Sequence, residues 1–198
     1  MKTVTLSEIV TVKSACPVGK LNANPDKEGV EIKVVAIKDI NVSDSNLNCE
    51  KIESVWLNDA DTVDKYKLIP GQVLITAKGQ SIRAQVYTSS RVPALPHTNL
   101  FVISDLRDNV LPEYLALYLS LGPVVDSLRE SMVGTTILSL SKKDLEKVEV
   151  RLPDLSIQKK LVEFSKSGKN FITARKHEIE NVSLIMDQTL VNKIMAEV

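Results

Sequence analysis

Several features that often carry chemistry are scarce in this chain of 198 residues. All seven glycines are isolated, so the sequence contains neither the G-x-G-x-x-G pattern of dinucleotide-binding folds nor a phosphate-binding P-loop. The two cysteines, Cys16 and Cys49, form no C-x-x-C pair, and we expect buried free thiols rather than a disulfide or a metal site. His97 and His177 lie far apart in the sequence and suggest neither a catalytic triad nor a zinc site. We therefore expect no catalytic residue, metal or cofactor in this chain.

Net charge and long apolar runs are absent as well. Lys plus Arg and Asp plus Glu number 25 each, so the charge of the whole molecule does not attract nucleic acid or anionic lipid. No apolar run is long enough to cross a membrane, and the first residues lack the apolar core of a signal peptide. We expect a cytoplasmic location without membrane contact. With 43% hydrophobic residues, the chain can still bury a substantial core.

The first part of the chain predicts a mixed, β-rich domain. Polar stretches with many turn-forming residues, at 22–29 and 43–48, predict exposed loops. Pro112 suits the first position of a helix, a second short helix is expected over about 124–132, and Ser141 with Asp144 resembles a capping box that begins a third. The fold class is therefore α+β, with a globular domain over residues 1–155. Short runs with β-branched residues predict strands at 31–37, 72–76, 100–103 and 148–152.

Residues 156–198 differ from the rest because they contain no proline and one glycine, with apolar residues recurring at spacings of three and four. This pattern predicts one long amphipathic helix, roughly 60 Å in length at 1.5 Å per residue. A stripe that continues so far predicts a partner, either a second copy of the chain or another protein. Folding back onto the first domain is the alternative. The stripe consists of Leu161, Phe164, Ile172, Ile179, Val182, Met186, Leu190 and Ile194.

The distribution of charge along the chain points to DNA. Residues 50–64 hold five acids and one lysine, whereas residues 65–104 hold no acid at all. A local excess of cations predicts a basic face, which binding to phosphates needs. A basic pair of strands that is merely solvated is the alternative. The five cations of the acid-free stretch are Lys65, Lys67, Lys78, Arg83 and Arg91.

Six short segments, in order, resemble the specificity domains of type I restriction-modification systems. The strand-and-loop segment of that family usually carries Asp where this chain has Gln72. The match extends over nearly the whole chain. Its segments are LIPGQVLITAKG at 68–79, NLFVI at 99–103, LPEYL at 111–115 with Tyr118 and Leu119, GTTI at 134–137, Leu140 and Ser141 with Leu145, and LPDL at 152–155 with Gln158.

This resemblance implies a non-catalytic DNA-recognition subunit. In the family, one recognition domain reads a DNA half-site, while long helices hold two such domains apart and dock the methyltransferase subunits. S-adenosylmethionine would belong to the modification subunit, and ATP to the restriction motor subunit. A specificity subunit carries two domain-helix units in tandem, whereas this sequence shows one and no internal repeat, so it looks like a half-length subunit that forms a homodimer through the helix.

Residue types in the acid-free stretch suggest roles on DNA. Lys78 and Arg83 suit phosphate or guanine, and Gln80, beside Ser81, can donate to and accept from adenine in the major groove. Two readings from other classes remain open. The chain could be a coiled-coil adaptor that binds protein, or an enzyme, although the NPD at residues 24–26 lacks the second proline and the aromatic residue of a methyltransferase loop. Weaker candidates for DNA contact are Thr98, Asn99, Thr135 and Thr136, because loop Asn and Thr often bond their own backbone.

Overall fold

A computed structural model of the chain describes residues 2–17, 28–41, 47, 49–79, 81–134 and 138–196. It divides into two units, Met1–Val162 and Glu163–Val198. The predicted α+β class and the long C-terminal helix are confirmed. The polar stretches 22–29 and 43–48 lie almost wholly outside the described residues. In chain order the elements are β1 (Lys2–Thr5), α1 (Leu6–Ile9), β2 (Thr11–Ser14), β3 (Val30–Val35), η2 (Ile37–Asp39), η3 (Cys49–Lys51), β4 (Ser54–Leu57), α2 (Ala60–Tyr66), β5 (Val73–Thr76), β6 (Ala84–Val86), β7 (Ala94–Pro96), β8 (Leu100–Ser104), α3 (Pro112–Leu119), α4 (Gly122–Glu130), α5 (Lys142–Glu146), β9 (Glu149–Leu152) and α6 (Leu155–Ala196).

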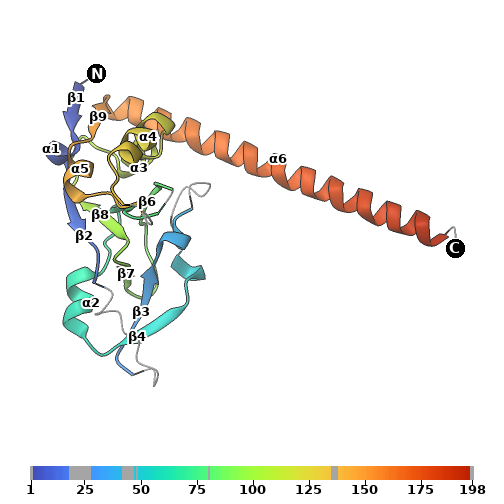
Figure 1. Cartoon of the computed structure of the whole chain (residues 1–198), viewed down its shortest axis with the longest axis horizontal. Coiled ribbons are helices and arrows are strands. Elements are labelled where there is room, and N and C mark those ends of the chain that lie inside the picture. Colours follow the sequence, from blue (N-terminus) through green and yellow to red (C-terminus); the bar gives the residue numbers. More distant parts are fainter. Residues whose placement is uncertain are drawn as a thin grey trace. The chain divides into compact units, whose positions relative to one another are not determined.

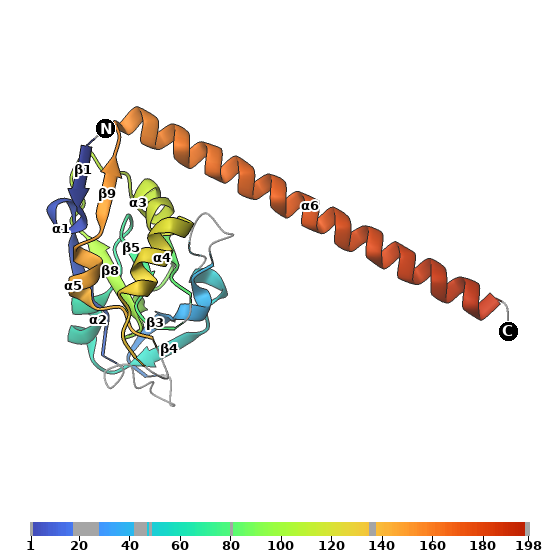
Figure 2. The ribbon, with the colours of Figure 1, turned by 45° about the horizontal axis from the view of Figure 1, so that its top comes forward.

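The strands of the first unit form three small sheets (Figure 1). The largest has the order β2-β8-β5-β6, and all its pairs are antiparallel. A second sheet, β4-β3-β7, contains a parallel pair, in which β3 lies beside β7. The third sheet joins β1 to β9, with Lys2 opposite Leu152 (Figure 2). Strands distant in sequence are therefore neighbours in space.

Strand β5, in the interior of the four-stranded sheet, is buried on both of its faces. Along β5, Val73 and Ile75 point into the main core, while Leu74 between them belongs to a second core on the other face. Alternate residues of a strand face opposite sides, so a sheet that is covered twice needs an unbroken apolar run. This explains why β5 is recognisable in the sequence as a continuous run instead of an alternating one.

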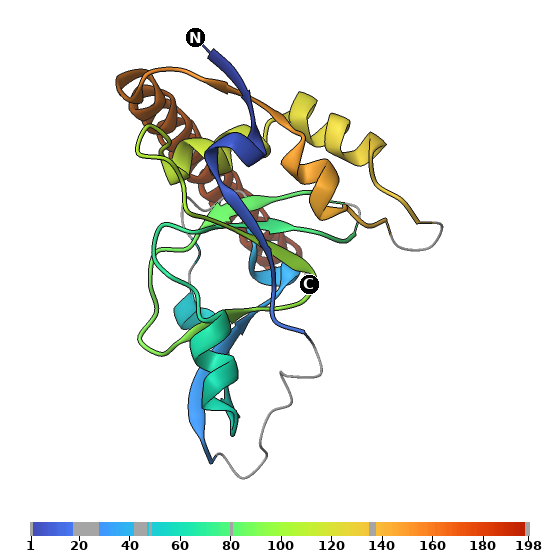
Figure 3. The same ribbon diagram turned by 90° about the vertical axis from the view of Figure 1, so that its left-hand side faces the viewer.

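Helices cover one face of this sheet, and the three-stranded sheet with α2 lies on the other side of it (Figure 3). Helix α3 packs against β5 and β6, and its Leu115 and Leu119 are fully buried. Pro112 occupies the first turn of α3, and the Ser141 hydroxyl accepts a hydrogen bond from the Asp144 amide at 3.1 Å, so both predicted helix starts are confirmed. Cys16 and Cys49 are buried free thiols, also as predicted.

Helix α6 contains 42 residues, which corresponds to about 60 Å. Every residue from 171 to 192 is exposed, including the predicted stripe residues Ile172, Ile179, Val182, Met186 and Leu190. The side chain of Ile194 lies outside the described residues. Within the part of the chain that the structure describes, no helix has the combination of length and hydropathy that crossing a bilayer requires.

Candidate nucleic-acid interface

Three chain segments that are distant in sequence meet where β5 ends. The Ala77 amide donates to the Asn99 carbonyl at 2.8 Å, and the Ala77 carbonyl accepts from the Leu140 amide at the same distance. The Gly79 amide donates to the Leu138 carbonyl at 3.0 Å. Residues 77–79 are therefore held between residues 97–99 and residues 138–140. We refer to these three segments as the loop junction.

Lys78 is the exposed cation of the loop junction, and Gly79 beside it has a φ of +100°. Such a left-handed conformation favours glycine. Among the residues that the structure describes, no atom outside the two neighbours of Gly79 lies within 4 Å of the position that a Cβ on Gly79 would take. Gly79 is partly exposed and Lys78 is exposed, so both lie at the surface of the described part of the domain.

Buried Thr76 shapes the turn that follows Lys78. Its hydroxyl donates to the Ser81 carbonyl at 2.9 Å and accepts from the Arg83 amide at 3.0 Å. The predicted contact residue Ser81 is half-buried and tied to this hydroxyl through its carbonyl. Sequence reasoning missed Thr76, because a strand-ending Thr shows no local sign of bridging a turn.

Thr98 and Asn99 lie in the adjacent turn and are partly exposed. The Leu100 amide donates to the His97 carbonyl at 2.9 Å, which closes this turn. The structure thus brings Thr98 and Asn99 next to Lys78, although about 20 residues separate them in the sequence.

Arg83 is placed differently from Lys78. It is half-buried, and its Nη1 donates to the Ile40 carbonyl at 3.3 Å. A guanidinium group carries five N–H donors, and this bond uses one of them. Its attachment to Ile40 reduces the freedom of the side chain and links β6 to the segment after η2.

The candidates Gln80, Thr135 and Thr136 lie outside the described residues. Residues that flank the last two are described. The Val133 amide donates to the Ser139 carbonyl at 3.1 Å, and the Ser139 amide donates to the Val133 carbonyl at 2.9 Å. Ser139 also pairs with Lys78, so this reciprocal pair joins Val133 to the loop junction.

In the folded chain, acidic residues from outside the acid-free stretch 65–104 lie close to some of its cations. Lys67 pairs with Asp64 at 2.8 Å, and a Glu50 carboxylate oxygen accepts from the backbone amide of Arg91 at 3.2 Å. Both acids come from the preceding acidic stretch. Lys67 is thus partly neutralised, whereas Lys65, Lys78 and Arg91 are exposed and Arg83 is half-buried.

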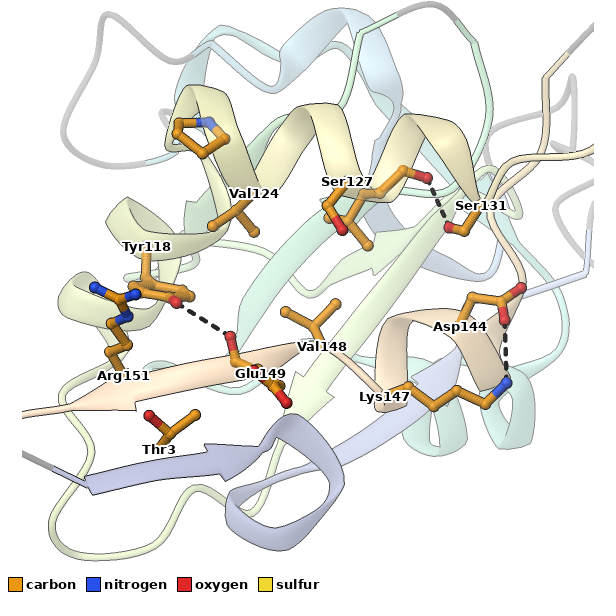
Figure 4. Close-up of a pocket in the computed structure, with 12 residues that line it drawn as sticks. Thr3, Tyr118, Val124, Ser127, Ser131, Asp144, Lys147, Val148, Glu149 and Arg151 are labelled. Atoms are coloured by element: carbon orange, nitrogen blue, oxygen red, sulfur yellow. Dashed lines mark hydrogen bonds and ion pairs between the residues drawn. The ribbon is translucent and has the colours of Figure 1, made fainter.

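A hollow of about 520 Å³ lies elsewhere, between β1, β9, α4 and α5 (Figure 4). Its charges are largely balanced, because Lys147 pairs with Asp144 at 3.4 Å, and Arg151 lies beside Glu149 along β9. A hydrogen bond from Ser141 lowers the pKa of Asp144, and the ion pair with Lys147 lowers it further. None of the residues predicted to contact DNA lines this hollow.

Comparisons with known proteins agree with the resemblance seen in the sequence. A family model described as "Type I restriction modification DNA specificity domain" matches residues 1–182. No curated protein matches the chain significantly.

Solved structures share the fold. The HsdS subunit from Thermoanaerobacter tengcongensis superposes with a TM-score of 0.61 at 19% identity, over 87% of this chain and 38% of that subunit. A chain from a study of complex assembly and conformational transition of the type I R-M system gives 0.62 at 18% identity, over 91% of this chain and 41% of that one. This chain thus spans about two fifths of the length of these neighbours.

Proposed function

Because the chain belongs to the type I restriction modification DNA specificity domain family, we propose that it binds double-stranded DNA through the loop junction and reads one half-site. The observation that carries this proposal is the meeting of three separate loops around exposed Lys78, beside the partly exposed Gly79. Lys78 and Arg83 contact phosphate or guanine, and Gln80 reads a base edge. Thr98 and Asn99 lie within reach of the same duplex.

In this proposal the chain itself performs no chemistry. It directs a methyltransferase subunit that binds S-adenosylmethionine, and a restriction subunit that consumes ATP, to the site that it recognises. The study of the assembled type I R-M system among the structural neighbours supports partners of this kind. The exposed apolar stripe of α6 provides the surface for these partners and for a second copy of the chain.

Two copies would supply the two readers that a bipartite site requires. Pairing of identical surfaces favours a twofold axis, and antiparallel helices would carry the domains to opposite ends. The two readers then face inverted half-sites on one side of the duplex, with centres about 10 base pairs apart, or a multiple of that. We therefore expect a target of inverted repeats around a spacer that is not read.

Mapping methylated sites in cells that express this chain with its modification subunit tests the proposal. Inverted half-sites around a fixed spacer would support it. An asymmetric or uninterrupted target would contradict the symmetric dimer, whereas the absence of salt-sensitive affinity for duplex DNA in the purified chain would favour a coiled-coil adaptor.

A further inference from the structure

The side chain of Gln158 is fully buried, although it lies near the start of a helix that is otherwise largely exposed. Its Nε2 donates to the Asn109 carbonyl at 2.8 Å and to the Pro153 carbonyl at 2.7 Å. Its Oε1 accepts from the Leu111 amide at 2.9 Å. Both N–H donors and the carbonyl oxygen of the amide are therefore in use.

The three partners come from different parts of the first unit. Pro153 directly follows β9, whereas Asn109 and Leu111 belong to the segment that leads into α3, where Leu111 is the N-cap residue. One turn after Gln158, Val162 packs against the main core. A single side chain thus joins the end of β9, the beginning of α3 and the first turn of α6.

Burial alone does not require an amide at this position. A methionine would fill a similar volume, but it would leave one buried N–H and two carbonyls of the backbone without these partners. A fully satisfied polar group fixes one geometry, because each of its bonds has a preferred direction, whereas apolar contacts tolerate small rotations. The glutamine therefore defines an orientation as well as filling space.

We propose that Gln158 is a positioning residue that holds the first two turns of α6 in one fixed orientation on the recognition domain. These two turns, with Gln158 and Val162, belong to the first unit of the chain, and α6 continues from them without proline to Ala196. This proposal deepens the proposed function and rests on it for its purpose, because two domains on paired helices read a fixed spacing only when each domain is held rigidly.

The test measures how tightly the helix is held. Spin labels are attached to cysteines introduced at Asp61 in α2 and at Lys160 in the second turn of α6, both of which are exposed. The native Cys16 and Cys49 thiols are buried, and burial raises the pKa of Cys49 to about 11, so labelling under native conditions spares them. Labelled chains are diluted with unlabelled ones, and pulsed electron paramagnetic resonance gives the distribution of distances within one chain.

With Gln158→Met we expect this distribution to become at least about twofold broader, because the three directional bonds are lost. The matched control is Tyr114→Phe, which removes the bond from the Tyr114 hydroxyl to the Arg151 carbonyl in the same unit and should leave the width unchanged. Equal widths in the parent chain and the folded Gln158→Met variant would overturn the proposal, as would equal broadening in Tyr114→Phe.

If Gln158→Met does not fold, Gln158→Glu replaces it, since the carboxylate keeps the size and the acceptor but loses both donors. Broadening without loss of fold supports the proposal, and an unchanged width contradicts it. No DNA is present in these measurements, so a failure of the proposed DNA binding would leave their result intact. In the methylation assay, the same variant should accept spacers of more than one length while reading the same half-site bases.

Discussion

The recognition domain and helix α6 show two opposite ways of using apolar residues. In the domain, Leu6, Ile75 and Leu115 are at most 1% exposed, and none of its described side-chain polar atoms is buried without a hydrogen-bond partner. In the helix, Ile179 is 68% exposed and Val182 is 53% exposed. The domain buries its apolar side chains and pairs its buried polar atoms, whereas the helix leaves its apolar stripe exposed. We therefore expect substitutions in the first region to affect folding and substitutions in the second to affect the proposed assembly.

The largest expected difference between the regions concerns stability. Leu115→Ala removes a fully buried side chain from the main core and should lower the free energy of unfolding by about 2–5 kcal/mol. Leu190→Ala, at a residue that is 56% exposed, should change it by less than about 0.5 kcal/mol in dilute solution. Urea denaturation measures both values. A comparable loss in the two variants would mean that the helix stripe already contributes to the folded single chain.

Assembly should show the reverse pattern. Val182→Glu combined with Met186→Glu places two charges in the apolar stripe and should weaken self-association at least about a hundredfold, because unpaired charge is costly to bury. Asn181→Glu combined with Gln188→Glu adds the same charge away from the stripe and serves as the control. Sedimentation velocity over a range of concentrations gives the association constants. A parent chain that remains monomeric at high concentration would contradict the dimer.

The recognition domain contains two pairs of cations that should differ in their effect on DNA affinity. Lys78→Ala combined with Arg83→Ala should reduce the slope of log affinity against log salt by about two units, one for each lost phosphate contact. Lys67→Ala combined with Arg91→Ala removes the same charge from residues placed near Asp64 and Glu50, and should leave the slope nearly unchanged. Fluorescence anisotropy with a labelled duplex measures both slopes. If the two double variants behave alike, DNA does not bind at the loop junction.

The smallest expected effect concerns a single base. Gln80→Ala should weaken discrimination at one base pair by about 1–3 kcal/mol while leaving the salt slope intact, because the amide carries no charge. Lys78→Ala alone should instead weaken binding to all sequences uniformly. Competition between duplexes that differ at one position separates the two results. A changed slope in Gln80→Ala would show that reading and anchoring are not divided between these residues.

Local patterns predicted much of this fold because local forces decide those parts. Strands such as β5 and β8 are apolar runs, α3 begins at a proline, and the spacing of apolar residues gives α6. Helix α2 was not predicted, because its clearest local sign is a cap at Asp59, which accepts from the Thr62 amide at 2.9 Å. Asp also occurs often in loops, so this sign is ambiguous.

The candidate site was less predictable, since it depends on contacts between distant segments. Proximity of Lys78 to Asn99 and Ser139 follows from strand pairing that no local pattern specifies. The basic stretch was evident in the sequence, but the acids that approach it could not be seen there. Gln158 was noticed only as part of a motif, and its burial depends on Asn109 and Leu111, almost fifty positions earlier.

The pairing of β1 with β9 bears on how the recognition domain can be exchanged between genes. It brings Lys2 opposite Leu152, just before α6 begins, so the two ends of the recognition domain meet at one place. A folded piece whose ends adjoin can be exchanged as a cassette with little disturbance to its surroundings. Under the proposed function, recombination between related genes at these two positions would exchange the domain proposed to read DNA and keep the sequence of α6, so one genetic step would change the specificity.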